Sequence, residues 1–173
     1  GLVGGPCLHK DPYIFSESLK KYNIKPEITL TARKINERQP SEIVKFIYKK
    51  FKKINKNKNL NITILGLAFK GFPITDDLRG SMSITLIKKL REKFKKSKFY
   101  GFDPFVQNQK IKEVGIKPTN SINNAFKNKD LVIIANNNKY FSELDIEKYS
   151  KLLNNKSIIY DVWNLFDKNI LIN

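Results

Sequence analysis

The stretch NITILGLAF, residues 61–69, decides the fold of the chain. Its residues are mostly apolar, and Gly66 follows the first apolar run. A short apolar run that ends in a glycine turn is typical of a strand buried inside a parallel sheet. We therefore predict a buried strand here and follow the pattern outward in both directions.

Toward the C-terminus, strand patterns alternate with helix patterns. Further strands are expected in KFYGFDP (98–104), LVIIANN (131–137) and KSIIYDVWN (156–164). Helices are expected in SMSITLIKKLREKFKK (81–96), NSINNAFKNKD (120–130) and DIEKYSKLL (145–153). This alternation predicts a Rossmann-like parallel sheet with helices on both faces.

Toward the N-terminus, the pattern is helical. Residues 1–11 are expected to form a loop, followed by a short helix over 11–22 with Asp11 at its N-cap. A glycine-free segment from Ile28 to about Lys56 has apolar residues at helical spacing, and Pro40 is expected to bend or restart that helix. The predicted class is therefore α/β, with a helical segment (1–57) before the sheet domain (58–173).

Composition narrows the function classes. The 173 residues include 33 lysines and arginines but only 16 aspartates and glutamates, so the formal charge is +17. A charge this positive makes nucleic-acid binding one of the functions to consider. Only four of these basic residues are arginine, and the lysines are spread evenly, so we expect no nucleic-acid partner. No apolar run reaches the roughly 20 residues of a membrane span. The single cysteine cannot form an internal disulfide, which indicates a reducing, cytoplasmic compartment. One cysteine and one histidine, without paired ligands, argue against a metal site.

The loop after the first strand, GLAFKGFPITDDLRGS (66–81), is unusually long. Strand-to-helix loops usually have about 2–6 residues. The loop lacks the G-x-G-x-x-G pattern of a dinucleotide site. It carries Lys70 and Arg79, two cations suited to phosphate or carboxylate groups near a helix N-terminus. Asp76 and Asp77 are expected to be loop and helix-cap residues.

Two separated motifs, GGPCLHKDP (4–12) and GLAFKGFPITDDLRGS (66–81), together resemble the nucleotide-sugar dehydrogenases. These are the UDP-glucose and UDP-N-acetylhexosamine 6-dehydrogenases. ARKINERQP (32–40) resembles the start of the long central helix of that family. The resemblance covers the whole chain and implies the C-terminal part of a longer enzyme, which carries the catalytic-cysteine loop and the UDP-sugar-binding domain.

The resemblance implies an NAD-dependent oxidation of the sugar C6 alcohol to a uronic acid. Cys7 matches the nucleophile that forms the thiohemiacetal and thioester, and Asp11 matches the residue that positions the hydrolytic water. A helix N-terminus and Lys10, both close to Cys7, favour the thiolate form of a cysteine. The implied substrate-binding residues are Gly4, Gly5, Leu8, Phe69, Lys70 and Trp163. Lys10 and Arg79 are the implied NAD contacts, and NAD itself is expected to bind mainly to a domain outside this chain.

The chain departs from the family pattern at three places, one of which is His9, where many members have proline. The spacing from Lys70 to Arg79 is two residues longer than in the commonest form, and Trp163 stands where an arginine often contacts the substrate. An indole could stack on a ring instead. UDP-glucose, UDP-N-acetylglucosamine and UDP-N-acetylmannosamine all remain possible substrates, with GDP-mannose less favoured.

The resemblance further implies a homodimer, built through the long helix, and a place in the synthesis of surface polysaccharide precursors. One alternative from another class remains open. It is a stand-alone nucleotide-sugar-binding module without catalysis.

Overall fold

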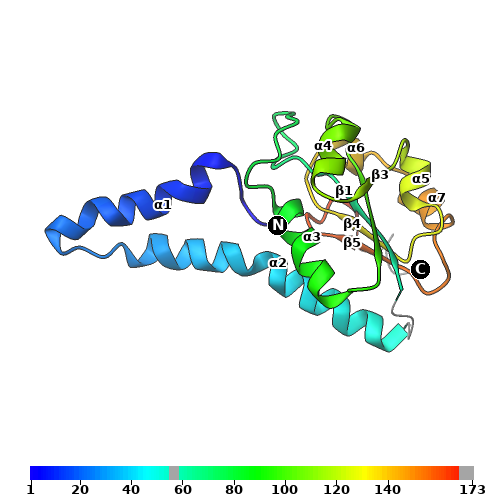
Figure 1. The fold of residues 1–173 in the computed structure, drawn as a ribbon, viewed down its shortest axis with the longest axis horizontal. Coiled ribbons are helices and arrows are strands. Elements are labelled where there is room, and N and C mark those ends of the chain that lie inside the picture. Colours follow the sequence, from blue (N-terminus) through cyan, green and yellow to red (C-terminus); the bar gives the residue numbers. More distant parts are fainter. Residues whose placement is uncertain (55–58, 168–173) are drawn as a thin grey trace.

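The computed structural model describes residues 1–54 and 59–167 (Figure 1). Within these ranges a parallel five-stranded sheet has the order β3-β2-β1-β4-β5. The strands are β1 (Asn61–Leu65), β2 (Lys98–Phe102), β3 (Lys117–Pro118), β4 (Leu131–Ile134) and β5 (Ile158–Asp161). The strand order reverses between β1 and β4, and open sheets of this kind bind ligands beyond the carboxyl ends of the strands at that point. The predicted α/β fold with a Rossmann-like sheet is confirmed.

Strand β1 separates two apolar layers. Ile62 and Ile64 are fully buried in one layer, and Leu65 is fully buried in the other. Residues of α2 (Glu27–Ile54), α3 (Met82–Lys93) and α4 (Asn108–Glu113) pack in the first layer. Residues of α5 (Ile122–Phe126), α6 (Lys139–Ser142) and α7 (Ile146–Ser150) pack in the second. Each fully buried aliphatic side chain contributes about 1.5–3 kcal/mol to the stability of the fold. The run 61–69 fixes the fold mainly because it buries such side chains on both faces of the sheet.

The N-terminal helices form a hairpin that extends away from the sheet (Figure 1). It consists of α1 (Pro6–Leu19), the short 3₁₀-helix η1 (Lys20–Tyr22) and the first half of α2. The second half of α2 returns to the sheet and buries Ile43, Val44, Ile47 and Phe51 in the first layer. Among the described helices, none combines the length and apolar character of a membrane span.

The expected start of the first helix was wrong, and of the two alternatives for Pro40 the restart is excluded. Helix α1 begins at Pro6, not at Asp11, because Gly5 takes a φ of 101° that opens the helix and Pro6 suits its first turn. Helix α2 continues through Pro40 without a restart, and Pro40 is buried. The expected end near Lys56 and the boundary between residues 57 and 58 lie outside the described residues.

The sequence patterns missed three short elements, β3, α4 and α6, which have two, six and four residues. Each of these elements spans fewer than two periods of a burial pattern, so the pattern does not repeat and tertiary contacts determine the element.

Candidate active site

Cys7 lies in the first turn of α1, and it is exposed. The sequence predicted a helix N-terminus close to this residue, and the structure places Cys7 inside that terminus. The first backbone N–H groups of a helix have no partner within the helix. Cys7 therefore lies at an end of the helix where N–H groups remain available to an acceptor.

A buried arginine on α2 holds this part of α1. Arg33 is 5% exposed, and its Nη1 donates a hydrogen bond of 3.1 Å to the backbone oxygen of Leu8. Pro12 has no N–H, so the helical bond that it would have donated to Leu8 is absent. Arg33 supplies that missing donor, and its Nη2 lies 3.4 Å from Nδ1 of His9. The guanidinium thus fixes the turn that follows Cys7.

Glu37 and Tyr13 complete the contact between α1 and α2. Arg33 Nε donates to Glu37 Oε1 at 2.8 Å, and the Tyr13 hydroxyl lies 3.0 Å from both carboxylate oxygens. Burial pushes the pKa of Glu37 upward, but the hydrogen bonds from Arg33 and Tyr13 and the guanidinium charge outweigh it, so that this pKa lies below its ordinary value.

The two sequence motifs meet at their glycines. A Cβ placed on Gly4 would lie 2.2 Å from the backbone oxygen of Gly80, and the N–H of Gly5 donates to that oxygen at 3.4 Å. A Cβ on Gly5 would lie 2.9 Å from the Phe69 ring. Glycine is therefore required here because the segment before Cys7 lies directly against the loop after β1.

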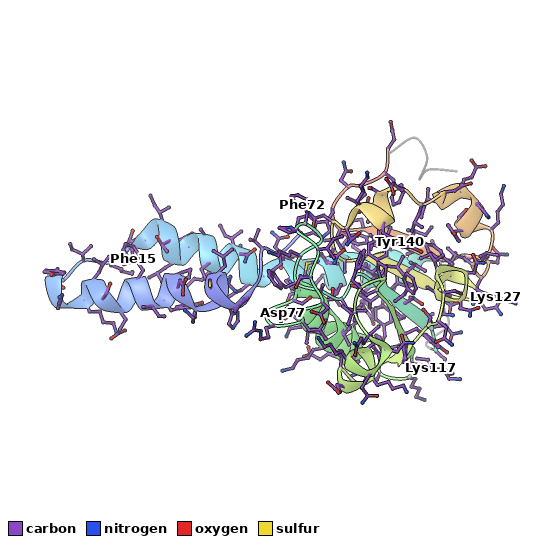
Figure 2. The ribbon with its side chains drawn as sticks, turned by 90° about the horizontal axis from the view of Figure 1, so that it is seen from above. Phe15, Phe72, Asp77, Lys117, Lys127 and Tyr140 are labelled. Carbon is purple, nitrogen blue, oxygen red and sulfur yellow. The ribbon has the colours of Figure 1, made fainter. Side chains whose placement is uncertain are left out.

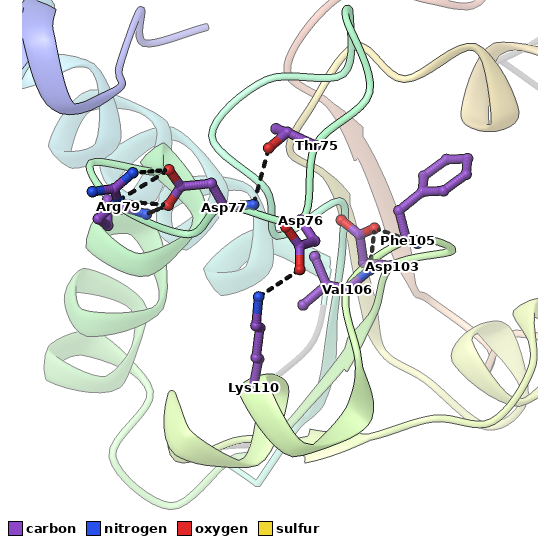
Figure 3. A network of polar contacts seen from close by, with 8 residues as sticks. All are labelled: Thr75, Asp76, Asp77, Arg79, Asp103, Phe105, Val106 and Lys110. Carbon is purple, nitrogen blue, oxygen red and sulfur yellow. Dashed lines mark hydrogen bonds and ion pairs between the residues drawn. The ribbon is translucent and has the colours of Figure 1, made fainter.

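A single carboxylate fixes the start of that loop. Asp103, at the carboxyl end of β2, is 8% exposed. Its Oδ2 accepts from the N–H groups of Leu67 (2.7 Å) and Ala68 (3.2 Å). Its Oδ1 accepts from those of Phe105 (2.9 Å) and Val106 (3.2 Å), as Figure 3 shows for the second pair. Asp103 therefore ties the loops after β1 and β2 together just before Phe69.

The remainder of the loop carries paired charges (Figure 3). Arg79 is exposed and donates to Asp77 through Nε and Nη2, with the shortest distance 2.7 Å, while Lys110 on α4 pairs with Asp76 at 2.5 Å. The hydrogen bond from Arg79 lowers the pKa of Asp77, and the one from Lys110 lowers the pKa of Asp76. The helix-cap expectation for the two aspartates was wrong, because Ser81 caps α3 by accepting from the N–H of Ser83.

The remaining charged residues of the predicted site are accessible. The ammonium group of Lys70 lies 5.2 Å from the centroid of the Phe69 ring. Lys10 and Asp11 form an exposed ion pair of 2.5 Å on α1, and the hydrogen bond that Lys10 donates to the Asp11 carboxylate raises the pKa of Lys10.

Asparagines directly after β4 form hydrogen bonds to the loop after β1, at the point where the strand order of the sheet reverses. The Nδ2 of Asn136 donates to the backbone oxygen of Ala68 at 3.4 Å, and the Oδ1 of Asn137 accepts from the N–H of Gly71 at 3.0 Å. A Cβ on Gly71 would lie 2.1 Å from the backbone nitrogen of Asn138. The loop after β1 therefore crosses this point and packs on the loop after β4.

Trp163 is tied to the same end of the sheet. Its Nε1 donates to the backbone oxygen of Ala135 at 2.9 Å, and a Cβ on Gly1 would lie 2.9 Å from its ring. Asp161 orients this turn by accepting from the N–H of Trp163.

Of the predicted site residues, the structure brings Gly5 and Phe69 into contact, and Gly4 packs on Gly80 of the same loop. It places Cys7, Leu8, Lys10 and Asp11 together on α1, with Leu8 bonded through its backbone oxygen to Arg33. Sequence reasoning missed Arg33, Asp103 and the three asparagines (136–138). The position of the asparagines directly after a buried strand was the available signal, because such positions border the switch point. In the part of the chain that the structure describes, no group of three His, Cys, Asp or Glu residues could hold a metal ion.

Comparison with known proteins gives a consistent result. Residues 63–168 match the UDP-binding domain of the UDP-glucose/GDP-mannose dehydrogenase family. The chain is 31% identical over 160 residues to the UDP-N-acetyl-D-mannosamine dehydrogenase of Pyrococcus horikoshii, covering 91% of this chain and 34% of that protein. It is 31% identical over 167 residues to the UDP-glucose 6-dehydrogenase of Rickettsia conorii, covering 95% and 37%.

A solved structure of the UDP-D-ManNAc dehydrogenase from Pyrococcus horikoshii superposes with a TM-score of 0.78 at 29% identity, covering 96% of this chain and 36% of that one. The chain thus spans about a third of the length of these relatives.

Proposed function

The chain belongs to the UDP-glucose/GDP-mannose dehydrogenase family, and we propose that it is the part of an NAD-dependent UDP-sugar 6-dehydrogenase that binds UDP-sugar and carries the catalytic cysteine. The direct packing of the glycine segment 4–5 on Gly80 and Phe69 supports this proposal most strongly. In that contact the segment directly before the exposed Cys7 packs against the loop of the UDP-binding domain, although the two motifs are some sixty residues apart in sequence.

The chemistry proposed for this chain is carried by Cys7 and Asp11. The Cys7 thiolate adds to the carbon of a C6 aldehyde, and the aldehyde oxygen takes a proton, which gives a thiohemiacetal. Bound NAD would supply the oxidant for that adduct, whose carbon would lose a hydride and whose hydroxyl would lose a proton to give a thioester. A water held by Asp11 then attacks the thioester carbon, releases the thiolate and leaves the uronic acid. A thiol suits this sequence because it is strongly nucleophilic and also leaves readily.

We place the substrate at the carboxyl end of the sheet. Phe69 and Lys70 offer an aromatic face and a cation for the nucleotide sugar, and Gly4, Gly5 and Leu8 line the approach from α1. Trp163 is the proposed substitute for the arginine of other family members. Its indole N–H is already bonded to Ala135, so it would contact the substrate through its ring face.

NAD, as the oxidant that the resemblance implies, does not fit the switch point of this sheet. A dinucleotide there needs a glycine-rich turn that leaves room for the pyrophosphate. Here Gly71 packs on Asn138, and the loop carries no such turn. We therefore propose only Lys10 and Arg79 as NAD contacts of this chain and assign the rest of NAD binding to parts of the enzyme beyond it.

The finer parts of the proposal follow from the family. They are cytoplasmic synthesis of a uronic acid for surface polysaccharide, and a homodimer in the complete protein. The substrate class is a UDP-sugar, either UDP-glucose or a UDP-N-acetylhexosamine.

Titration calorimetry of the 173-residue chain tests the proposal. We expect UDP and UDP-sugars to bind weakly and NAD to give no measurable heat. Lys70→Gln should weaken UDP binding. The control Lys139→Gln removes an exposed lysine of α6, which pairs with Glu143, and should leave UDP binding unchanged. Tighter binding of NAD than of UDP would contradict the assignment. A complete enzyme that binds UDP-sugars but never reduces NAD would support the non-catalytic module instead.

A further inference from the structure

A second pocket lies away from the proposed active site, between α5 and the β2–β3 edge of the sheet. It has a volume of about 410 Å³, within the range of small-molecule sites. Its lining residues are Asn61, Tyr100, Lys117, Pro118, Thr119, Asn120, Asn124, Lys127, Asn128 and Lys129. Figure 2 shows Lys117 and Lys127 on the part of the molecule opposite to the helical hairpin that carries Phe15.

The charge of this pocket is uncompensated. Three of its lining residues are lysines, and none of the ten described residues that line it is acidic. Lys117 and Lys127 are exposed and form no ion pair with any residue in the described ranges. Exposed lysines without an ion pair to a described residue also occur elsewhere, for example Lys95 and Lys96, so the feature that sets this pocket apart is the absence of any acidic side chain from its lining.

Lys129 makes the imbalance costly, because it is only 7% exposed. Its ammonium group donates to the backbone oxygens of Asn124 (3.0 Å) and Lys127 (2.8 Å) and lies 4.5 Å from the centroid of the Tyr100 ring. All three partners are neutral, so they solvate the ammonium without balancing its charge. Burial lowers the pKa of Lys129, and the charge of Lys117 lowers it further, against an upward contribution from Asp130.

Asp130 keeps its negative charge beside Lys129, but it is not one of the residues that line the pocket, and its carboxylate oxygens are bound to other partners. Its Oδ2 accepts from the N–H of Asn61 at 2.7 Å, and its Oδ1 accepts from Nδ2 of Asn154 at 2.8 Å. A negative group that entered the pocket would therefore meet three cations with no competing carboxylate on the walls. The neutral walls present amide and hydroxyl groups, which suit an oxyanion better than an apolar anion.

We propose that this pocket binds a small phosphate-bearing ligand, held by Lys117 and Lys127 at its mouth and by the buried charge of Lys129. The site is separate from the proposed UDP-sugar site. It binds through charge-assisted hydrogen bonds to phosphate oxygens and requires no chemistry.

Binding is tested on the 173-residue chain by nuclear magnetic resonance, with inorganic phosphate and glucose 6-phosphate added at constant ionic strength. We expect shifts of the backbone amides of Thr119, Asn120 and Asn124. The variant Lys117→Gln/Lys127→Gln should raise the dissociation constant by about tenfold or more, because it removes two charge-assisted contacts. The control Lys95→Gln/Lys96→Gln removes the same charge from two exposed lysines between α3 and β2 and should bind as the unmodified chain does.

Tighter binding of glucose 6-phosphate than of phosphate would show that the residues lining the pocket also recognise the sugar. Equal binding of the two ligands would show a site for the phosphate group alone. Both results support the proposal. Three results would overturn it: no amide shift at the pocket, equal weakening in both double variants, or displacement of phosphate by duplex DNA with loss of that binding as salt rises. The last result would indicate a general polyanion surface. UDP binding by the Lys117→Gln/Lys127→Gln variant remains a separate measurement, so failure here leaves the proposed dehydrogenase function untouched.

Discussion

At the scale of single residues, the proposed chemistry depends on one side chain and on its supports. Cys7 lies at the start of α1, and Arg33 replaces the hydrogen bond that Pro12 cannot make to Leu8. A proline five residues after the cysteine would otherwise leave the helix frayed where the nucleophile is needed. The buried guanidinium therefore explains how this sequence combines a proline with an ordered first turn.

Replacement of Cys7 should separate the two oxidations in the complete enzyme. Formation of the aldehyde does not use the thiol, whereas the second oxidation needs the thiohemiacetal. Serine is a much weaker nucleophile at neutral pH, so Cys7→Ser should lose uronic acid production by several orders of magnitude and retain some NAD reduction. Product analysis alongside NADH absorbance would distinguish the two steps. Uronic acid production near the normal rate in Cys7→Ala would contradict the nucleophile assignment.

Thr63 offers a test of packing without any link to catalysis. It is fully buried in β1, and its Oγ1 has no hydrogen-bond partner among the described residues. Thr63→Val keeps the shape and removes the unpaired hydroxyl, so the free energy of unfolding should rise by about 1 kcal/mol. Thr119→Val is the matched control, because its hydroxyl donates to the Gly101 oxygen at 3.3 Å and its loss should destabilise the fold. Urea denaturation measures both; a loss of stability in Thr63→Val would contradict the reasoning.

At the scale of elements, the sequence predicted those with a strong burial pattern. Strands β1, β2, β4 and β5 and helices α3, α5 and α7 lie where the apolar patterns placed them. The start of α1 was missed because the deciding feature is the positive φ of Gly5, which opens the helix one residue before Pro6. A conformation that depends on packing against Phe69 cannot be read from local composition.

The same distinction applies to the candidate site. Its motif residues could be predicted from the resemblance, since chemistry restricts which residues appear at these positions. Asp103 could not, because its role depends on bringing the loops after β1 and β2 within hydrogen-bonding distance. Arg33 was also missed, since a surface arginine and a buried one look alike in a helical pattern.

The contact between α1 and α2 should depend on pH through Glu37. Its pKa is lower in the folded chain than the unfolded value of about 4.3, so its contribution to stability is present above that value and is lost as the pH falls through the folded pKa. Glu37→Gln should therefore be less stable than the unmodified chain at neutral pH, and the difference should shrink below about pH 4.

Urea denaturation of both proteins across this pH range measures the effect. Glu42→Gln, which removes an exposed partner of Lys45 on the same helix, should leave the pH dependence unchanged. A stability gap between Glu37→Gln and the unmodified chain that stayed constant down to pH 3 would show that the ion pair does not carry the dependence.

At the scale of the whole molecule, the helical hairpin exposes more large apolar side chains than the sheet domain does. The hairpin exposes a set of large apolar residues: Leu8, Tyr13, Ile14, Phe15, Tyr22, Ile24, Ile28 and Ile35. The sheet domain exposes Phe72, Ile74 and Phe105. Scattered exposed apolar side chains are ordinary, but an apolar surface spread along a projecting pair of helices is typical of a protein interface.

We therefore expect the complete protein to dimerise through the hairpin. Phe15→Ser/Ile28→Ser should yield a monomer, because it removes a large aromatic and a residue that is 87% exposed from this surface. Phe72→Ser is the control: Phe72 is 82% exposed but lies on the sheet domain, well away from Phe15 (Figure 2). Light scattering coupled to gel filtration at high micromolar concentration would read the mass of each variant. A complete unmodified protein that is monomeric would contradict the assignment, because the interface would then be absent. A dimer that only Phe72→Ser disrupts would also contradict it, because the interface would then lie on the nucleotide-binding half of the molecule.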